Sequence, residues 1–186
     1  MKTVARIAVL FLCLLSLAAI AQKAKAEPQY TDSLVGAIDM NEIRKAKELI
    51  KRGVPKEDYI DGLLMASMRG RKDLIALILE RKIDINSIST RFGQAALHQT
   101  EITGDLVTAE FLIQRGADIN AQDSNGQTIL MGAAFQGNKQ MVDMLLSRRA
   151  NVTLKDKQGR TALTYAKTGA RPGIIVPILV SAGAKD

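Results

Sequence analysis

Polar turn residues and apolar, helix-forming residues follow one another along this chain in blocks that recur at a fixed period. Residues 123–130 (DSNGQTIL) match residues 156–163 (DKQGRTAL), and a weaker copy at residues 90–97 (TRFGQAAL) lies 33 residues before the first. Each copy has a glycine within a polar turn, where a positive φ costs glycine little. A threonine or alanine then precedes an apolar run, and a threonine hydroxyl there can accept hydrogen bonds from free backbone N–H groups. The pattern predicts a turn followed by a short helix in every copy.

A second block follows the first with the same period. Residues 109–120 (AEFLIQRGADIN) match residues 142–153 (VDMLLSRRANVT), again 33 residues apart. Apolar residues in both copies stand at i, i+3 and i+4, which is the spacing of one face of a helix. Gly104 and Gly137 lie between the two blocks, where a glycine commonly ends a helix. Each period therefore predicts two short helices joined by a glycine turn.

These features together resemble the ankyrin-repeat family, whose period is 33 residues and whose first helix opens with a T-P-L-H motif. The resemblance covers about residues 31–186 and implies an all-α solenoid of about five helix-turn-helix repeats with short finger loops. The chain lacks the proline of that motif throughout, and Arg149 stands where the family has a glycine. The outer repeats are irregular, because the ends of a solenoid present one face to water. The expected repeats are residues 31–54, 57–86, 90–120, 123–153 and 156–186.

The start of the chain has the layout of a secretory signal peptide. Lys2 and Arg6 precede an uncharged run at residues 7–21, which ends in the small-x-small pattern AIA. A membrane anchor is the alternative, but about 15 apolar residues fall short of the roughly 20 that span a bilayer. The sequence predicts a signal peptide at residues 1–21, with cleavage after residue 26 (AKA) as the second choice, and a linker at residues 22–30. Similar small ankyrin proteins are exported by Gram-negative bacteria, so the resemblance implies a periplasmic location and no membrane association after cleavage.

Composition limits the chemistry that the mature protein can perform. Cys13 is the only cysteine and lies in the predicted signal peptide, so disulfides and cysteine-bound metals are not expected. The only histidine, His98, occupies the last position of the T-P-L-H motif, and the resemblance implies that it hydrogen-bonds a neighbouring loop. Carboxylates occur together at Glu57, Asp58 and Asp61, where they favour a helix N-terminus. The chain shows no catalytic or phosphate-binding motif, and we expect neither enzyme activity nor a cofactor.

Charge and aromatic content argue against a nucleic-acid partner. The whole chain has 26 Lys and Arg against 19 Asp and Glu, and removal of residues 1–21 takes away two cations, leaving 24 − 19 = +5. These cations are mixed with acids along the chain, aromatic residues make up 4%, and tryptophan is absent. Nucleic-acid-binding proteins usually gather positive charge on one face. The sequence therefore predicts a protein partner and no nucleic acid.

The resemblance implies binding through a concave surface built from finger tips and the exposed side of each first helix. Met68, Ile102 and Phe135 occupy the same place in three consecutive repeats, and Phe92 lies at a finger tip. Apolar side chains surrounded by cations and amides are typical of a protein-binding patch. The polar residues expected around them are Arg69, Arg91, Gln94, Asn125, Gln127, Gln136, Lys157 and Arg160.

The sequence thus predicts a monomeric, non-catalytic protein-binding module in the periplasm that supports or regulates a partner protein. One alternative is an immunity protein that covers a toxin delivered to the periplasm. Another is a hydrolase with an unrecognised carboxylate site. The sequence does not identify the partner.

Overall fold

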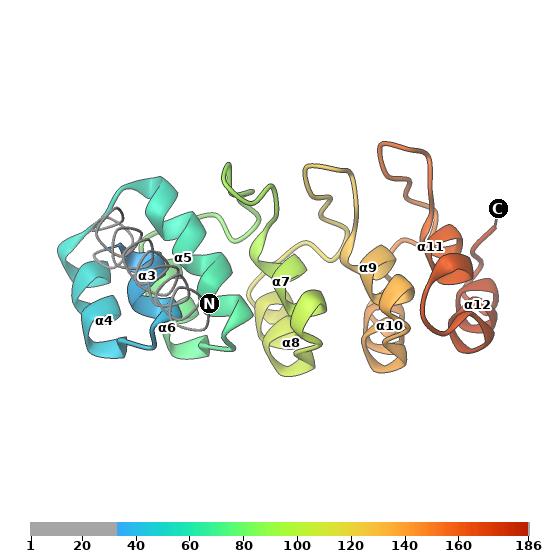
Figure 1. The fold of residues 1–186 in the computed structure, drawn as a ribbon, viewed down its shortest axis with the longest axis horizontal. Coiled ribbons are helices and arrows are strands. Elements are labelled where there is room, and N and C mark those ends of the chain that lie inside the picture. The colour runs from blue at the N-terminus through green and yellow to red at the C-terminus, as the bar shows by residue number, and fades with distance from the viewer. Residues whose placement is uncertain (1–32, 186) are drawn as a thin grey trace, which may run out of the picture.

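The computed structural model describes residues 33–185 of the chain, and the predicted signal peptide and linker lie outside them. Within this range the chain forms ten helices and no β-strand (Figure 1). The helices are α3 (Leu34–Asp39), α4 (Ile43–Arg52), α5 (Lys56–Met68), α6 (Lys72–Leu79), α7 (Ala96–Thr103), α8 (Leu106–Gln114), α9 (Ile129–Gln136), α10 (Lys139–Ser147), α11 (Ala162–Thr168) and α12 (Pro172–Ser181).

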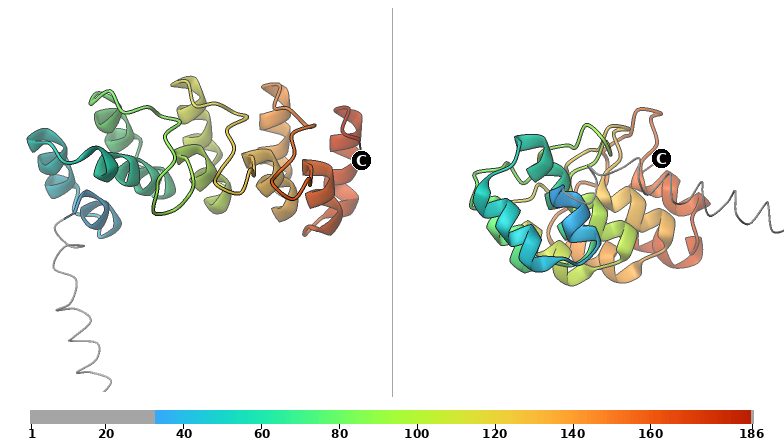
Figure 2. Two further views of the ribbon diagram at one scale, coloured as in Figure 1. Left: turned by 90° about the horizontal axis from the view of Figure 1, so that it is seen from above. Right: turned by 60° about the vertical axis from the view of Figure 1, so that its left-hand side comes forward.

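Consecutive helices pair, and the five pairs stand in a row along the long axis of the molecule (Figure 1). The first helices pack against one another in the order α3, α5, α7, α9 and α11, while the second helices lie on the opposite side of the row (Figure 2). This arrangement confirms the predicted all-α solenoid. Each pair lies within one of the expected repeats, except that α5 begins at Lys56, one residue before the expected start.

Finger loops project from the row between the last four helix pairs (Figure 1). Neighbouring fingers are joined by backbone hydrogen bonds, from Ser124 N to Gly93 O at 2.7 Å and from Lys157 N to Asn125 O at 3.0 Å. Only residues 53–55 separate α4 from α5, so the first two pairs have no finger between them. The side of the solenoid that carries the fingers is therefore most extensive over α7, α9 and α11.

Local sequence signals set the helix ends. Thr128 and Thr161 are N-cap residues, and their hydroxyl oxygens accept hydrogen bonds from Met131 N at 3.4 Å and Thr164 N at 3.3 Å. Gly137 ends α9 with φ = 70°, a left-handed conformation that suits glycine. These caps fix where each first helix starts and stops, and so which side chains face away from the neighbouring helices.

Each second helix of the third and fourth repeats is followed by a left-handed residue, and the chain does not always use glycine there. Gly116 has φ = 93°, whereas Arg149, one period later, has φ = 63°. An L-residue with a Cβ atom is strained in this region by roughly 1–2 kcal/mol. The departure from the family pattern at Arg149 therefore changes local stability and leaves the fold intact.

No helix among residues 33–185 has the length and apolar character needed to cross a bilayer.

Candidate protein-binding surface

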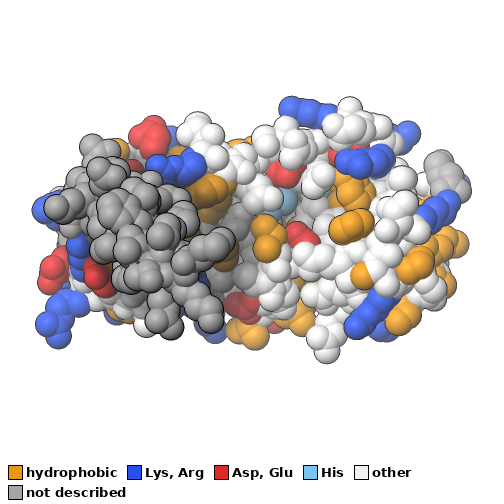
Figure 3. Space-filling view, in the orientation of Figure 1, with side chains coloured by type: hydrophobic (Ala, Val, Ile, Leu, Met, Phe, Trp, Pro, Cys, Tyr) orange, Lys and Arg blue, Asp and Glu red, His pale blue; other side chains and the backbone are white. Residues whose placement is uncertain are grey.

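Three predicted apolar residues reach solvent on the side of the solenoid that carries the fingers. Phe92, Ile102 and Phe135 have 46%, 51% and 50% of their surface exposed, and we call these three residues the apolar strip. Figure 3 shows hydrophobic side chains at the surface over α7 and over α9. Met68, expected to continue the strip on α5, is partly buried instead. Consecutive exposed apolar side chains on one face are typical of a binding surface.

Tyr165 extends this surface, although the sequence argument did not include it. Its ring lies edge-on to the ring of Phe135, with centroids 6.3 Å apart and an interplanar angle of 89°. Its hydroxyl accepts hydrogen bonds from Gln127 Nε2 at 2.7 Å and Arg160 Nη2 at 2.6 Å, and donates to Asp156 Oδ2 at 2.8 Å. Gln127 and Arg160 are therefore held by the protein itself.

Asp156 organises the last finger. Burial alone would raise the pKa of this carboxyl, but hydrogen bonds from the Arg160 backbone, the Tyr165 hydroxyl and the Arg160 side chain outweigh it and lower the pKa to about 2. Asp156 Oδ1 also accepts from Gln158 N at 2.9 Å. Asp123 has the same role in the preceding finger, where it accepts from two backbone N–H groups. These acids shape finger turns and are not available for chemistry.

The three arginines expected around the strip each have an acid nearby within the protein. Arg69 forms an ion pair with Asp39, and Arg160 Nε lies 2.8 Å from Asp156 Oδ2. Arg91 Nε is 3.9 Å from Asp61 Oδ2, and its guanidinium also lies 5.9 Å from the ring of Phe92. Each of these three arginines therefore has an acid within reach on its own or an adjacent repeat, and their place in a partner surface stays a prediction.

The remaining predicted polar residues lie on the same side, and they differ in whether their side chains are hydrogen-bonded within the protein or exposed. Gln94 Oε1 accepts a hydrogen bond from Gln99 Nε2 at 2.6 Å, whereas Asn125 and Gln136 are exposed. Lys157 is exposed at the last finger, and no ion pair with it occurs within residues 33–185. Amides thus supply most of the polar groups that a partner could contact directly.

Glu101 belongs to this surface, although it was not among the predicted site residues. It lies on α7 beside Ile102, and its carboxyl group rests on Gly132 of α9, since a Cβ atom on that glycine would come within 2.5 and 2.7 Å of the two carboxyl oxygens. Burial raises the pKa of Glu101 to about 7, against the smaller opposing effect of a hydrogen bond from Gln136. One signal was present in the sequence, because the equivalent residues one and two periods later are Ala134 and Lys167, neither of which is acidic.

His98 has the contact that the family resemblance implies. Its ring is nearly inaccessible, and Nε2 lies 3.0 Å from the carbonyl oxygen of Gln127 in the next finger. Burial lowers the pKa of His98, so the ring is neutral at pH 7 and its Nε2–H donates to that carbonyl. The histidine thus joins α7 to the following finger. Within residues 33–185, no three His, Cys, Asp or Glu side chains come together in a way that could hold a metal ion.

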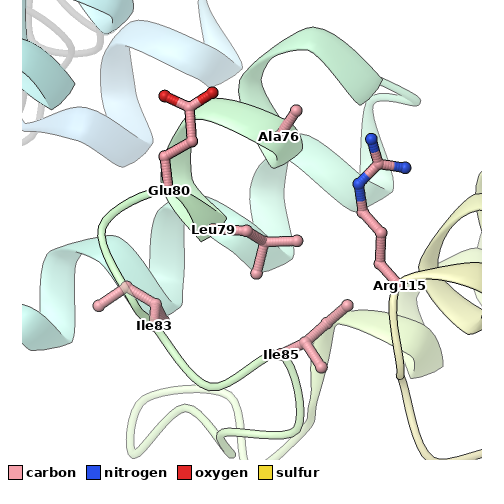
Figure 4. Close-up of a pocket in the computed structure, with 6 residues that line it drawn as sticks. All are labelled: Ala76, Leu79, Glu80, Ile83, Ile85 and Arg115. Atoms are coloured by element: carbon pink, nitrogen blue, oxygen red, sulfur yellow. The ribbon is translucent and has the colours of Figure 1, made fainter.

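A shallow pocket of about 480 Å³ lies between α6 and the loop that follows α8 (Figure 4). Its lining is Ala76, Leu79, Glu80, Ile83, Ile85 and Arg115. The guanidinium of Arg115 stacks on Phe111 at 3.6 Å, which holds its charge over α8. The pocket contains none of the predicted binding residues.

Comparison with known proteins finds ankyrin repeats in the second half of the chain. The family model described as ankyrin repeats (3 copies) matches residues 100–185. An ankyrin repeat and SAM domain-containing protein 6 of Rattus norvegicus is 44% identical over 97 residues, which is 50% of this chain and 11% of that protein. Two palmitoyltransferases are each 27% identical: AKR1 of Lachancea kluyveri over 50% of this chain and 14% of its own length, and Hip14 of Drosophila melanogaster over 55% and 17%.

The chain therefore spans between 11% and 17% of the length of these relatives, and the similarity to the palmitoyltransferases is confined to their ankyrin regions. Ankyrin repeats serve generally as modules for protein–protein binding. The family match over residues 100–185 and the five stacked helix pairs of the described structure together show an all-α ankyrin-repeat solenoid.

Proposed function

We propose that this protein is a non-catalytic binding module that supports or regulates a partner protein held on its finger side. The apolar strip carries the proposal, because Phe92, Ile102 and Phe135 each leave about half of their surface in water. Exposed apolar side chains on consecutive repeats stabilise a complex when a partner covers them. A central aromatic residue flanked by other contacts is also the usual form of a binding hot spot.

The polar chemistry of the finger side favours binding over catalysis. His98 is engaged with a backbone carbonyl, and Asp123 and Asp156 accept hydrogen bonds that close the finger turns. The groups left for a partner are amides, apolar surface, the exposed cation of Lys157 and the carboxyl group of Glu101. Such a mixture of apolar and polar groups is common in non-obligate interfaces.

We further propose that binding takes place in the periplasm. This rests on the basic start at Lys2 and Arg6, the uncharged run at residues 7–21 and the small-x-small pattern that ends it. A module exported in this way would meet a partner that is itself exported or exposed to the periplasm.

The test compares capture of partners by the tagged full chain and by single-residue variants. Phe135→Ala and Ile102→Ser remove exposed apolar surface from the finger side, whereas Val107→Ser removes it from α8, where Val107 is 61% exposed. Proteins cross-linked in cells are identified by mass spectrometry, and each variant is also melted. We expect one protein to be lost with the first two variants and kept with Val107→Ser, at melting temperatures near that of the wild type. Equal capture by all variants would contradict the proposal.

A further inference from the structure

The carboxyl group of Glu101 lies within the finger-side surface, between the exposed parts of α7 and α9. Its neighbour Ile102 is 51% exposed on the same helix, and Phe135 is 50% exposed on α9 beside Gln136, whose side chain hydrogen-bonds the carboxyl group. Figure 3 shows an acidic side chain between the hydrophobic side chains that reach the surface over α7 and α9. Glu101 is the only Asp or Glu on these two helices. A molecule that covers the apolar strip must also cover this carboxylate.

The surroundings of Glu101 do not neutralise its negative charge. The residue lies in the last turn of α7, and Gln136 is the last residue of α9, so both nearby helix ends carry the negative end of the helix dipole. Helix α9 has no charged residue, and the structure gives no ion pair for Glu101 within residues 33–185. The carboxylate is thus partly removed from water without a cation in exchange, which is an unfavourable arrangement for a charged group.

Several charged groups on the elements packed around α7 pair with groups other than Glu101. On the α5 side, Arg69 pairs with Asp39. On α8, Glu110 pairs with Arg148 at 3.1 Å, and Asp105 caps the helix by accepting from Thr108 N. His98 of α7 itself contacts the finger carbonyl of Gln127. None of these groups supplies the positive charge that Glu101 lacks.

We propose that Glu101 determines partner specificity by receiving a lysine or arginine side chain of the partner between Ile102 and Phe135. The proposal rests on the proposed function, because it places the partner over the apolar strip. A cation at this position would restore the interaction that the carboxylate lost on leaving water, and an arginine could bond both oxygens. An acidic or purely apolar segment would instead leave the carboxylate buried and unpaired, which is strongly unfavourable in an interface.

Binding of this kind is linked to a proton. The free protein holds a proton on Glu101 up to about neutral pH, because burial raises the pKa of this group to about 7. The complex requires the ionised carboxylate, so a proton is released when the partner's cation arrives. Affinity should therefore rise with pH through the range below 7 and level off above it.

The experiment uses a phage-displayed library of random 12-residue peptides, selected on the full chain at pH 8. Peptides that bind the Ile102→Ser protein more weakly than wild type, but bind the Val107→Ser protein as well as wild type, are taken as finger-side binders. Of these, only peptides without histidine and acidic residues are kept. We expect the kept peptides to share a Lys or Arg flanked by apolar residues. Replacing that basic residue of the peptide by Gln should weaken binding of the peptide to the wild-type protein by about tenfold. The same change in the peptide should alter its affinity for the Glu101→Gln protein little. Wild-type binding should weaken by roughly ten- to thirtyfold from pH 8 to pH 5.5, and Glu101→Gln binding should not.

The outcomes separate the two proposals. Finger-side peptides without a shared basic residue, or with equal affinity for wild type and Glu101→Gln at both pH values, would overturn the role of Glu101 and leave the proposed function standing. A selection that gives no peptide sensitive to Ile102→Ser would overturn the proposed function, and the role of Glu101 with it. Melting of Glu101→Gln alongside the wild type shows that the binding difference is not caused by unfolding.

Discussion

Replacing Glu101 by Gln should make the stability of this protein less dependent on pH. Glutamine keeps the shape of the side chain and can still hydrogen-bond Gln136, but it cannot ionise. In the folded protein the pKa of Glu101 is raised from its ordinary value of 4.5 to about 7, mainly by burial. The folded state therefore keeps a proton that the unfolded chain releases between these two values. Stability from the protonated group is fully present below pH 4.5 and is lost as the pH rises to about 7.

The size of the effect follows from the same two pKa values. At about 1.36 kcal/mol for each tenfold change in proton affinity, raising the pKa from 4.5 to about 7 corresponds to at most about 3.4 kcal/mol. Glu101 is partly open to solvent, which screens its charge, and we reduce the expected loss to about 1–2 kcal/mol. Glu101→Gln should be more stable than wild type by this amount at pH 8 and close to wild type at pH 4.5.

Urea unfolding followed by circular dichroism at pH 4.5, 6, 7 and 8 measures this difference. Glu110→Gln is the matched control, because Glu110 is a glutamate on α8 whose ion pair with Arg148 lies at the surface, and surface pairs contribute about 0–1 kcal/mol. The control should change little between pH 6 and pH 8, since an ion pair at the surface contributes little to stability. Parallel curves for wild type and Glu101→Gln across the whole range would refute the assignment of Glu101 as a buried, unpaired acid.

Three other expectations test the fold and its processing. Arg149→Gly should stabilise the protein by about 0.5–1 kcal/mol in urea unfolding, whereas Gly116→Arg, at the matching site with no atom near the added Cβ, should destabilise it by about 1 kcal/mol; changes of the opposite sign would exclude φ strain as the cause. Leu145→Ala, at a fully buried position of α10, should lower the free energy of unfolding by about 2–5 kcal/mol, and a loss below about 1 kcal/mol would contradict its place in the core. N-terminal sequencing of the protein extracted from the periplasm should start at Gln22 or Glu27, and recovery of an intact Met1 would argue against cleavage.

Most of the fold could be predicted from the 33-residue period of the repeats. Helix starts at Thr128 and Thr161 and the helix end at Gly137 are set by residues within the same turn, so the sequence alone could predict them. Stacking then follows because each short helix pair has an apolar face that only its neighbours can cover.

Side-chain pairing on the finger side was harder to predict, because it joins separate repeats. Arg69 reaches Asp39, 30 residues away, and Gln127 reaches Tyr165, 38 residues away. Neither distance equals the period, so comparing equivalent positions does not bring these partners together. The exposed residues of the apolar strip could be found from the period, whereas the charges around it required the folded structure.

Glu101 shows how comparison between repeats can identify a residue that departs from their pattern. An acidic residue at this place is peculiar to the third repeat among the last three, because Ala134 and Lys167 stand at the equivalent places one and two periods later. Gly132 is also out of pattern, because Gln99 and Tyr165 occupy its place one period before and one after. The two departures fit one another in space, since the carboxyl group of Glu101 fills the volume that a side chain at residue 132 would need. The stack accommodates this carboxylate at the expense of a regular helix contact, and its own helices provide no cation for it. Such a carboxylate is best explained by a role in binding another molecule.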